Sequence, residues 1–157
     1  MEDNKERIIT IQTLAGDGKA AELIELLETG HTKNEINAAL ETAIAYSQIE
    51  IAEYLLSLGA DISYHDYDGA YYAAHNNELK GLQFAIENSV PINVKNGMLL
   101  NTAIETAINT KSTEMVSWLK DKGANLELLT TQTINSMQKY GSKELNNLIK
   151  DRWLEIK

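Results

Sequence analysis

Residues 102–125 read TAIETAINTKSTEMVSWLKDKGAN, and this stretch decides the fold class. In its first half, apolar residues recur at spacings of three and four, as on one face of a helix, at Ala103, Ile104, Ala107 and Ile108. A polar break at residues 110–113 offers hydroxyl caps for a second helix, and Gly123 offers a left-handed stop. Between them the apolar face continues with Met115, Val116 and Leu119. Two such short helices need neighbours to bury their apolar faces.

The same pattern recurs along the chain. Residues 40–61 (LETAIAYSQIEIAEYLLSLGAD) have Gly59 where Gly123 stands, and residues 10–30 end in the same way at Gly30. Residues 68–91 match with Ser89 in the place of the glycine, and a degraded copy covers residues 131–153. The landmarks at 30, 59, 89 and 123 are 29, 30 and 34 residues apart. This period predicts about five stacked helix-loop-helix units.

The repeated unit resembles the ankyrin repeat family. Residues 102–104 (Thr-Ala-Ile) stand for the family's Thr-Pro-Leu, and the Leu-Leu…Gly-Ala-Asp run that ends at Asp61 is similar to its second helix and stop. Residues 59–69 (GADISYHDYDG) are similar to its loop, but no copy has the proline and the next helix is about three residues short. The resemblance implies an all-α, ankyrin-like helical solenoid in a single domain, 1–157, with repeats at about 3–30, 35–61, 68–91, 99–125 and 130–153.

The third predicted repeat is irregular. Its second helix contains Gly81, which costs about 1 kcal/mol relative to alanine in a helix interior. One interpretation is close helix packing at Gly81; the other is a soft repeat that yields when a partner docks. If the site tolerates a methyl group, Gly81→Ala should stabilise the protein by at most about 1 kcal/mol. Tyr54, Phe84 and Trp118 share one position of successive second helices, which favours packing between repeats over a ligand-binding aromatic strip.

Composition narrows the function classes. The chain has 157 residues, 43% of them hydrophobic, which suits one domain with a continuous core. It has no cysteine, so disulfides and thiolate chemistry are excluded. The net charge of −9 is spread along the chain without a basic stripe, which argues against a nucleic-acid partner. With neither a signal peptide nor a stretch of transmembrane length, the sequence predicts a cytoplasmic protein with no membrane partner, and we expect a monomer.

Few residues suggest chemistry. His65, Asp66, Asp68 and His75 are the one cluster with metal-ligand character, but they lack the spacing of known zinc motifs. An ankyrin-type loop accounts for the two aspartates as turn formers. The sequence also has no Gly-x-Ser-x-Gly elbow and no phosphate-binding glycine loop. We therefore predict no metal site, no cofactor and no enzymatic activity.

A binding surface is what remains. The resemblance implies protein binding through the concave side, which is built from loop tips and from exposed positions of each first helix. Mapped onto this chain, the predicted protein-binding residues are Glu41, Tyr46, His65, Asp66, Tyr67, Tyr71, His75, Glu105 and Asn109. Tyrosine and histidine concentrate in residues 64–75 and suit an interface, because such amphipathic anchors are frequent hot spots. The alternative is that these tyrosines only cover a short repeat.

The predicted function is therefore a non-catalytic protein-protein interaction module whose partner could be basic, given the acidic chain. A more specific alternative is an inhibitor or immunity-type protein that masks the basic active site of a toxic enzyme. A third hypothesis, from another class, is a structural spacer or self-associating unit.

Overall fold

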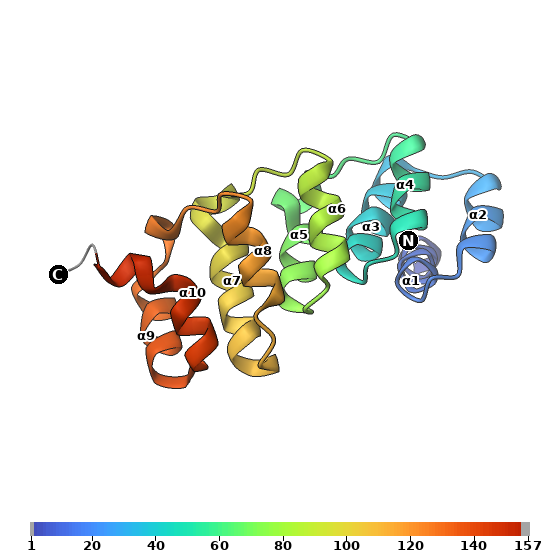
Figure 1. Cartoon of the computed structure of the whole chain (residues 1–157). Coiled ribbons are helices and arrows are strands. Elements are labelled where there is room, and N and C mark those ends of the chain that lie inside the picture. The colour runs from blue at the N-terminus through green and yellow to red at the C-terminus, as the bar shows by residue number, and fades with distance from the viewer. Residues whose placement is uncertain (1, 155–157) are drawn as a thin grey trace. The chain divides into compact units, whose positions relative to one another are not determined.

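The computed structural model describes the backbone of residues 2–154 and the side chains of residues 3–150. Within this range the chain is helical without any strand, which confirms the all-α prediction (Figure 1). The side chain of Trp153, in the fifth predicted repeat, lies outside the described residues. The elements are α1 (Glu2–Gly16), α2 (Ala20–Glu28), α3 (Lys33–Ala45), α4 (Ile49–Ser57), α5 (Tyr64–His75), α6 (Leu79–Glu87), α7 (Val94–Thr110), α8 (Glu114–Asp121), the 3-10 helix η1 (Leu126–Leu128), α9 (Thr131–Tyr140) and α10 (Lys143–Leu154).

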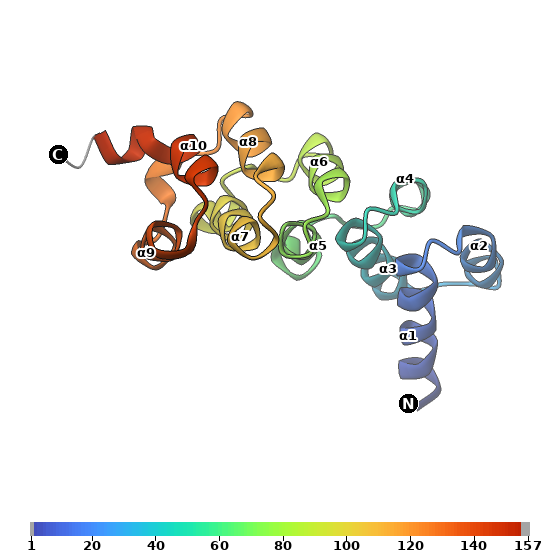
Figure 2. The same ribbon diagram turned by 60° about the horizontal axis from the view of Figure 1, so that its bottom comes forward.

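The chain divides into two compact units, and the division falls within α5 and α6. The first unit extends to Ala73 and includes Lys80–Val90, whereas the second contains Ala74–Leu79 and the chain from Pro91 onward. In the first unit α3 packs against α1 and α4, and α1 also packs against α2 (Figure 2). In the second unit α7 packs against α8 and α9, and α10 contacts all three of these helices.

Helix α3 is the centre of the first unit. Thr32 and Glu35 form a capping box at its start, because each side chain accepts the other's backbone N–H. Its apolar residues are almost fully buried, among them Ile36, Ala39, Leu40, Ala43 and Ile44. Ser47, with φ 56°, turns the chain away after the helix. Because α3 is buried along most of its length, it holds the side chains that project from it in fixed positions.

Arg7 on α1 is half-buried, whereas the charged residues just before it, Lys5 and Glu6, are exposed. Its Nε donates to Oε1 of the buried Glu35 at 2.9 Å, and the guanidinium also donates to the carbonyls of Leu26 and Gly30. A buried carboxylate needs such a partner, because burying an isolated charge is costly. Helix α1 is thus tied to α3 by a partly buried ion pair, which the apolar spacing of the sequence does not reveal.

Gly81 packs directly against α3. A Cβ atom at Gly81 would lie 2.0 Å from the Ile44 carbonyl oxygen, and the Gly81 N–H donates to the Ser47 hydroxyl at 2.8 Å. Of the two interpretations, close packing is therefore the one that the structure supports. The condition under which Gly81→Ala was expected to stabilise the protein is not met, because this site has no room for a methyl group.

Helices α5 and α7 each begin with one turn of left-handed helix. His65, Asp66 and Tyr67 have φ between 51° and 67°, and residues 95–97 have φ between 49° and 83°. In each turn the third residue donates its N–H four residues back, Tyr67 to Ser63 and Gly97 to Asn93, both at 3.2 Å. A left-handed turn is the compact connection that replaces a longer loop, and the right-handed part of α5 is left with residues 68–75 only.

Residues 102–125, from which the repeat pattern was derived, lie in the second unit and fold largely as predicted. Its apolar residues are buried in α7 and α8, namely Ala103, Ile104, Ala107, Ile108, Met115, Val116 and Leu119. Gly123, with φ 91°, ends the second helix. The predicted hydroxyl cap is wrong, however, because Thr113 precedes α8 without capping it and donates instead to Glu144 Oε1 at 2.9 Å.

Candidate functional site

Of the predicted binding residues of the first unit, His65 lies beside Glu41 on α3. The backbone at Gly69 approaches α3 closely, since a Cβ there would lie 3.3 Å from the Glu41 Cα. This approach, together with the left-handed turn, brings His65 and Asp68 to Glu41. His65 Nδ1 is 3.0 Å from Glu41 Oε2, and one ligand atom from each of the three side chains lies within 4.8 Å of the others.

In this cluster, opposing electrostatic effects act on the pKa of Glu41. Burial raises the pKa of Glu41, and the negative charge of Asp68 raises it further. The charge of His65 and its hydrogen bond act in the opposite direction and lower the Glu41 pKa, but the net shift is upward. Two carboxylates in a partly desolvated site therefore favour a positive group between them.

Tyr64 supports the cluster from the side. Its ring stacks on the His65 imidazole with a centroid distance of 3.8 Å, and its hydroxyl donates to Asn34 Oδ1 at 2.7 Å. Burial, and secondarily the charge of Glu41, raise the pKa of the Tyr64 hydroxyl. The sequence did not indicate Tyr64 or Asn34 as site residues, since nothing in their spacing of 30 positions shows that they meet.

The tyrosines of α3 and α5 differ in exposure. Tyr46, at the C-terminal end of α3, is 52% exposed, and Tyr72 on α5 is 42% exposed. Tyr71, one of the predicted binding residues, is half-buried and lies edge-to-face with Tyr72 at 5.1 Å. Tyr67 is also half-buried, whereas Asp66 is exposed. The more accessible aromatic surface of α5 is thus Tyr72, which the sequence did not select.

The remaining predicted residues belong to the second unit. His75 is exposed, and its backbone carbonyl accepts a hydrogen bond from the Thr106 hydroxyl at 3.3 Å. Thr106 directly follows Glu105 in the chain. Asn109 follows Glu105 by one helical turn and is exposed. Glu105 Oε1 is buried and has no hydrogen-bond partner among the described residues. An orphaned carboxylate oxygen of this kind stands ready to accept a hydrogen bond.

The cluster with metal-ligand character in the structure differs from the one that the sequence suggested. The sequence grouped His65, Asp66, Asp68 and His75, whereas the structure joins His65 and Asp68 to Glu41. Among the described side chains, neither Asp66 nor His75 belongs to that group. Glu41 is 24 residues from His65 in sequence, so no short motif could have identified it.

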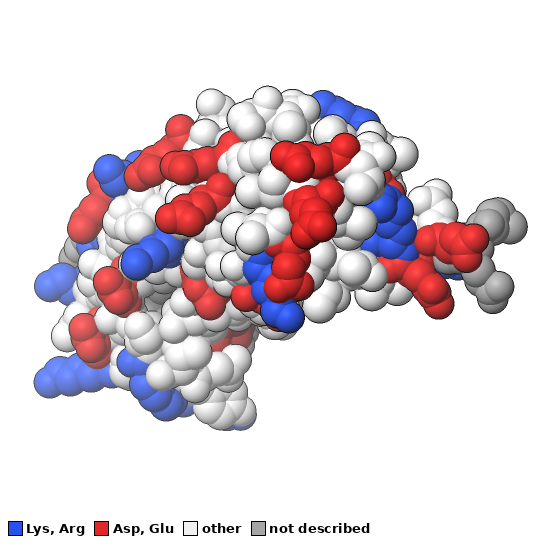
Figure 3. Space-filling model, turned by 90° about the vertical axis from the view of Figure 1, so that its right-hand side faces the viewer, with Lys and Arg blue, Asp and Glu red and all other residues white. Residues whose placement is uncertain are grey.

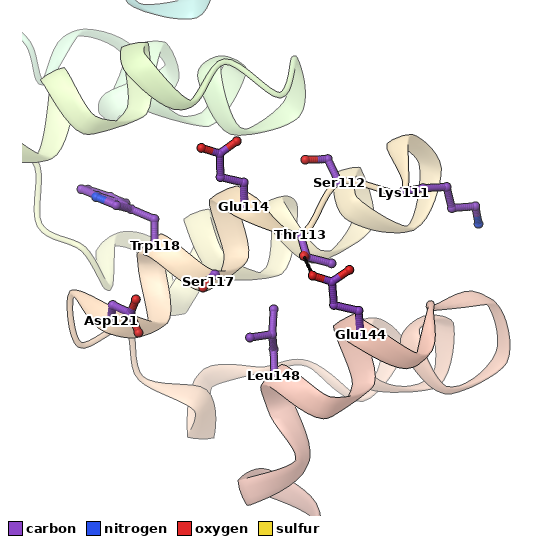
Figure 4. Close-up of a pocket in the computed structure, with 9 residues that line it drawn as sticks. All are labelled: Lys111, Ser112, Thr113, Glu114, Ser117, Trp118, Asp121, Glu144 and Leu148. Atoms are coloured by element: carbon purple, nitrogen blue, oxygen red, sulfur yellow. Dashed lines mark hydrogen bonds between the residues drawn. The ribbon is translucent and has the colours of Figure 1, made fainter.

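A second feature is a groove between α8 and α10, with a volume of about 570 Å³ (Figure 4). Glu144 and Leu148 point from α10 toward α8, and the Thr113 hydroxyl meets Glu144 across the gap (Figure 4). The lining residues are Lys111, Ser112, Thr113, Glu114, Ser117, Trp118, Asp121, Glu144 and Leu148. It lies on the side of the second helices, where the sequence did not predict a site.

The groove combines negative charge with an aromatic ring. Three carboxylates line it, against the single cation of Lys111. Trp118 is half-buried there, and Lys122 Nζ lies 5.8 Å from its ring centroid, within the range of a cation–π interaction. Of the three aligned aromatics, Phe84 is buried as packing predicts, whereas Trp118 borders this open site. Such a lining suits an ammonium or guanidinium group.

Comparison with known proteins does not name a family. No protein-family model matches the chain, and no curated protein is similar to it in sequence. In the part of the chain that the structure describes, no helix combines the length and apolar character needed to cross a membrane.

Proposed function

We propose that this protein is a non-catalytic binding module of the ankyrin-like solenoid type, which docks a protein partner on the side built by its first helices. The observation that supports this proposal is that α3 and α5 of the first unit carry both exposed tyrosines, Tyr46 and Tyr72, and the contact between Glu41 and His65. Large amphipathic rings beside fixed charged groups are typical of interface hot spots. Helices α3 and α5, which carry these groups, contribute them to the first unit.

The charge of the chain indicates the kind of partner. With a net charge of −9, the protein should attract a basic surface and raise its association rate. On the face drawn in Figure 3, acidic side chains are spread out and interrupted by basic ones. Acidic charge is therefore distributed on that face and not gathered into one patch.

The test begins with purification of a partner from native lysate on immobilised wild-type protein, followed by titration of variants against it. Tyr72→Ala should weaken binding about thirtyfold, because loss of an interface tyrosine commonly costs about 2 kcal/mol. Tyr71→Ala should weaken binding less, since the ring is half-buried and contributes to packing. Glu105→Gln should slow association at low salt only.

The matched control is Glu28→Gln, an exposed carboxylate on α2, which should bind like the wild type. Thermal melts of every variant separate loss of fold from loss of contact. If Glu28→Gln weakens binding while Tyr72→Ala does not, the partner uses the second-helix side. If light scattering detects only self-association and no other partner is captured, the spacer hypothesis replaces this proposal.

The inhibitor-type function is a second candidate, and the groove between α8 and α10 favours it. A lysine or arginine of a basic enzyme could enter between the carboxylates of Glu114, Asp121 and Glu144 and lie against Trp118. In that case the double variant Glu114→Gln/Asp121→Asn should reduce affinity for the captured partner at least tenfold, whereas Tyr72→Ala should not. The opposite pattern supports the first-helix side.

A further inference from the structure

We propose that Glu41, His65 and Asp68 form a binding site for a divalent transition-metal ion, for which Zn²⁺ is the best match. The site joins α3 to the left-handed turn within the first unit. This inference goes beyond protein binding and does not depend on it, because it concerns the purified chain alone.

The distances suit a metal ion without large rearrangement. Zinc binds imidazole nitrogen and carboxylate oxygen at about 2.0–2.2 Å, so two neighbouring ligand atoms around one ion lie about 3.0–3.5 Å apart. His65 Nδ1 and Glu41 Oε2 are 3.0 Å apart, and one ligand atom from each of the three side chains lies within 4.8 Å of the others. A spacing of up to 4.8 Å is longer than the spacing around one ion, so binding requires the side chains to move closer together.

Charge also favours a cation here. Glu41 is half-buried and Asp68 stands close enough to repel it. A divalent ion neutralises both carboxylates at once. It takes the place of the hydrogen that His65 Nδ1 shares with Glu41. From an imidazolium that proton is released to solvent, and from the neutral Nδ1–H tautomer it is released while solvent protonates Nε2, so that in both cases a neutral imidazole remains as the ligand. Exposure of His65 leaves an outward coordination position open to water.

The ligands are held before any ion binds. Gly69 sets the distance between α3 and α5, and the left-handed turn fixes the backbone of His65. Tyr64 stacks on the imidazole and is anchored by Asn34, which restricts the ring orientation as outer-shell residues do in metal sites. One imidazole with two carboxylates suits zinc and its neighbours, whereas Ca²⁺ and Mg²⁺ prefer all-oxygen sites.

The test uses tag-free protein stripped of metal with a chelator, with Zn²⁺ as the titrant in calorimetry. Wild-type protein should bind one Zn²⁺, and at a free Zn²⁺ concentration about 100 times the Kd its melting temperature should rise by about 5 °C or more. Glu41→Gln and His65→Asn should each lose more than the roughly 10- to 100-fold in affinity that removal of an outer-shell residue costs. Asparagine is chosen at position 65 because it tolerates the left-handed backbone.

Two controls retain the site. Asp66→Asn removes a neighbouring exposed carboxylate, and His75→Ala removes a histidine of the other unit, and both should bind Zn²⁺ like the wild type. Co²⁺ provides an independent readout, because its visible absorption reports direct ligation and should vanish in His65→Asn. Unchanged binding in His65→Asn, equal losses in the controls, or Ca²⁺ binding as tight as Zn²⁺ binding would overturn the proposal and leave an adventitious metal ion only. Absence of Zn²⁺ binding by the wild type would overturn it as well.

Discussion

The third and fourth helix pairs use the same left-handed turn with very different residues. At the start of α7 the turn is Lys95-Asn96-Gly97, and glycine and asparagine are the residues that adopt this backbone most readily. At the start of α5 it is His65-Asp66-Tyr67, in which histidine and aspartate are found in this conformation more often than most residues but the bulky tyrosine is not. The left-handed conformation costs an ordinary residue about 1–2 kcal/mol. The first turn therefore persists because side-chain contacts hold it, and these contacts are the ones that form the cluster around Glu41.

The second helices of the two pairs differ as well. Counted back from the left-handed stops at Ser89 and Gly123, Gly81 in α6 stands where α8 has Met115. Met115 is buried and fills space with its side chain, whereas Gly81 fills it with backbone against Ile44. The third pair thus achieves close packing by the absence of a side chain, and it has no tolerance for adding one.

The largest expected effect breaks that contact. Gly81→Ala should destabilise the protein by about 3 kcal/mol, because overpacking against a rigid backbone carbonyl forces α6 away from α3. Chemical denaturation of the variant measures this directly. Ser57→Ala, an exposed change near the end of α4, is the control and should alter stability by less than about 0.5 kcal/mol. A Gly81→Ala variant as stable as the wild type would mean that α6 is not packed against Ile44.

Exchange of residue types between the two turns gives the next effect. Gly97→Ala should cost about 2 kcal/mol, since a Cβ there lies 2.7 Å from the Leu128 Cβ and the residue has φ 83°. Tyr67→Gly should change stability by less than about 1 kcal/mol, because relief of the strained backbone offsets the entropy of glycine and the lost ring contacts. Paired denaturation curves test this asymmetry. Equal losses in the two variants would show that the Tyr67 turn stores no strain.

The sequence was sufficient for the helices because their apolar spacing depends on residues three and four apart. The buried stripes of α7 and α8 follow from this period alone. The left-handed turns were less accessible: Asn96-Gly97 is a recognisable signal, but nothing in His65-Asp66-Tyr67 predicts the same backbone. That turn is fixed by partners on α3, which local propensity does not see.

The candidate site shows the same limit. The ankyrin resemblance was enough to select Glu41, His65 and Asp66 as predicted binding residues, but not to decide which of them meet. Glu41 meets His65 and Asp68 because Gly69 allows α5 to approach the backbone of α3. A glycine at 69 or 81 matters because it allows close contact with residues of α3 that are distant in sequence. Helix propensity describes only the local cost of such a glycine.

A smaller effect concerns the hydrogen bond that holds the His65 turn. In chelator, a double-mutant cycle of Glu41→Gln and His65→Asn should give a coupling free energy of about 0.5 kcal/mol, because the pair is partly exposed and screened by solvent. The matched cycle of Glu41→Gln with Asp66→Asn should give a coupling close to zero. Urea unfolding of the four proteins in each cycle provides the measurement. Equal coupling in both cycles would show that the cluster is a general charge effect and not a specific contact.

The smallest effect distinguishes Asp61 from Pro91, which occupy corresponding positions in the loops that precede α5 and α7. Asp61 Oδ1 accepts the hydroxyl and the backbone N–H of Ser63 at 2.7 and 2.9 Å, and these bonds lower the pKa of its carboxyl below the usual 3.8. A carboxyl whose pKa is lower in the folded state stabilises the fold above its unfolded pKa, and this contribution disappears as the pH falls through the folded pKa. Because Asp61 is almost fully exposed, the change should appear as local fraying of the turn and not as global unfolding. An NMR titration should therefore give Asp61 a midpoint below 3.8, with the Ser63 amide shifting in parallel, while the amide of Ile92 after Pro91 should show no such transition. A midpoint of 3.8 or above would mean that the Asp61–Ser63 hydrogen bonds do not persist in solution, and that the two loops begin alike.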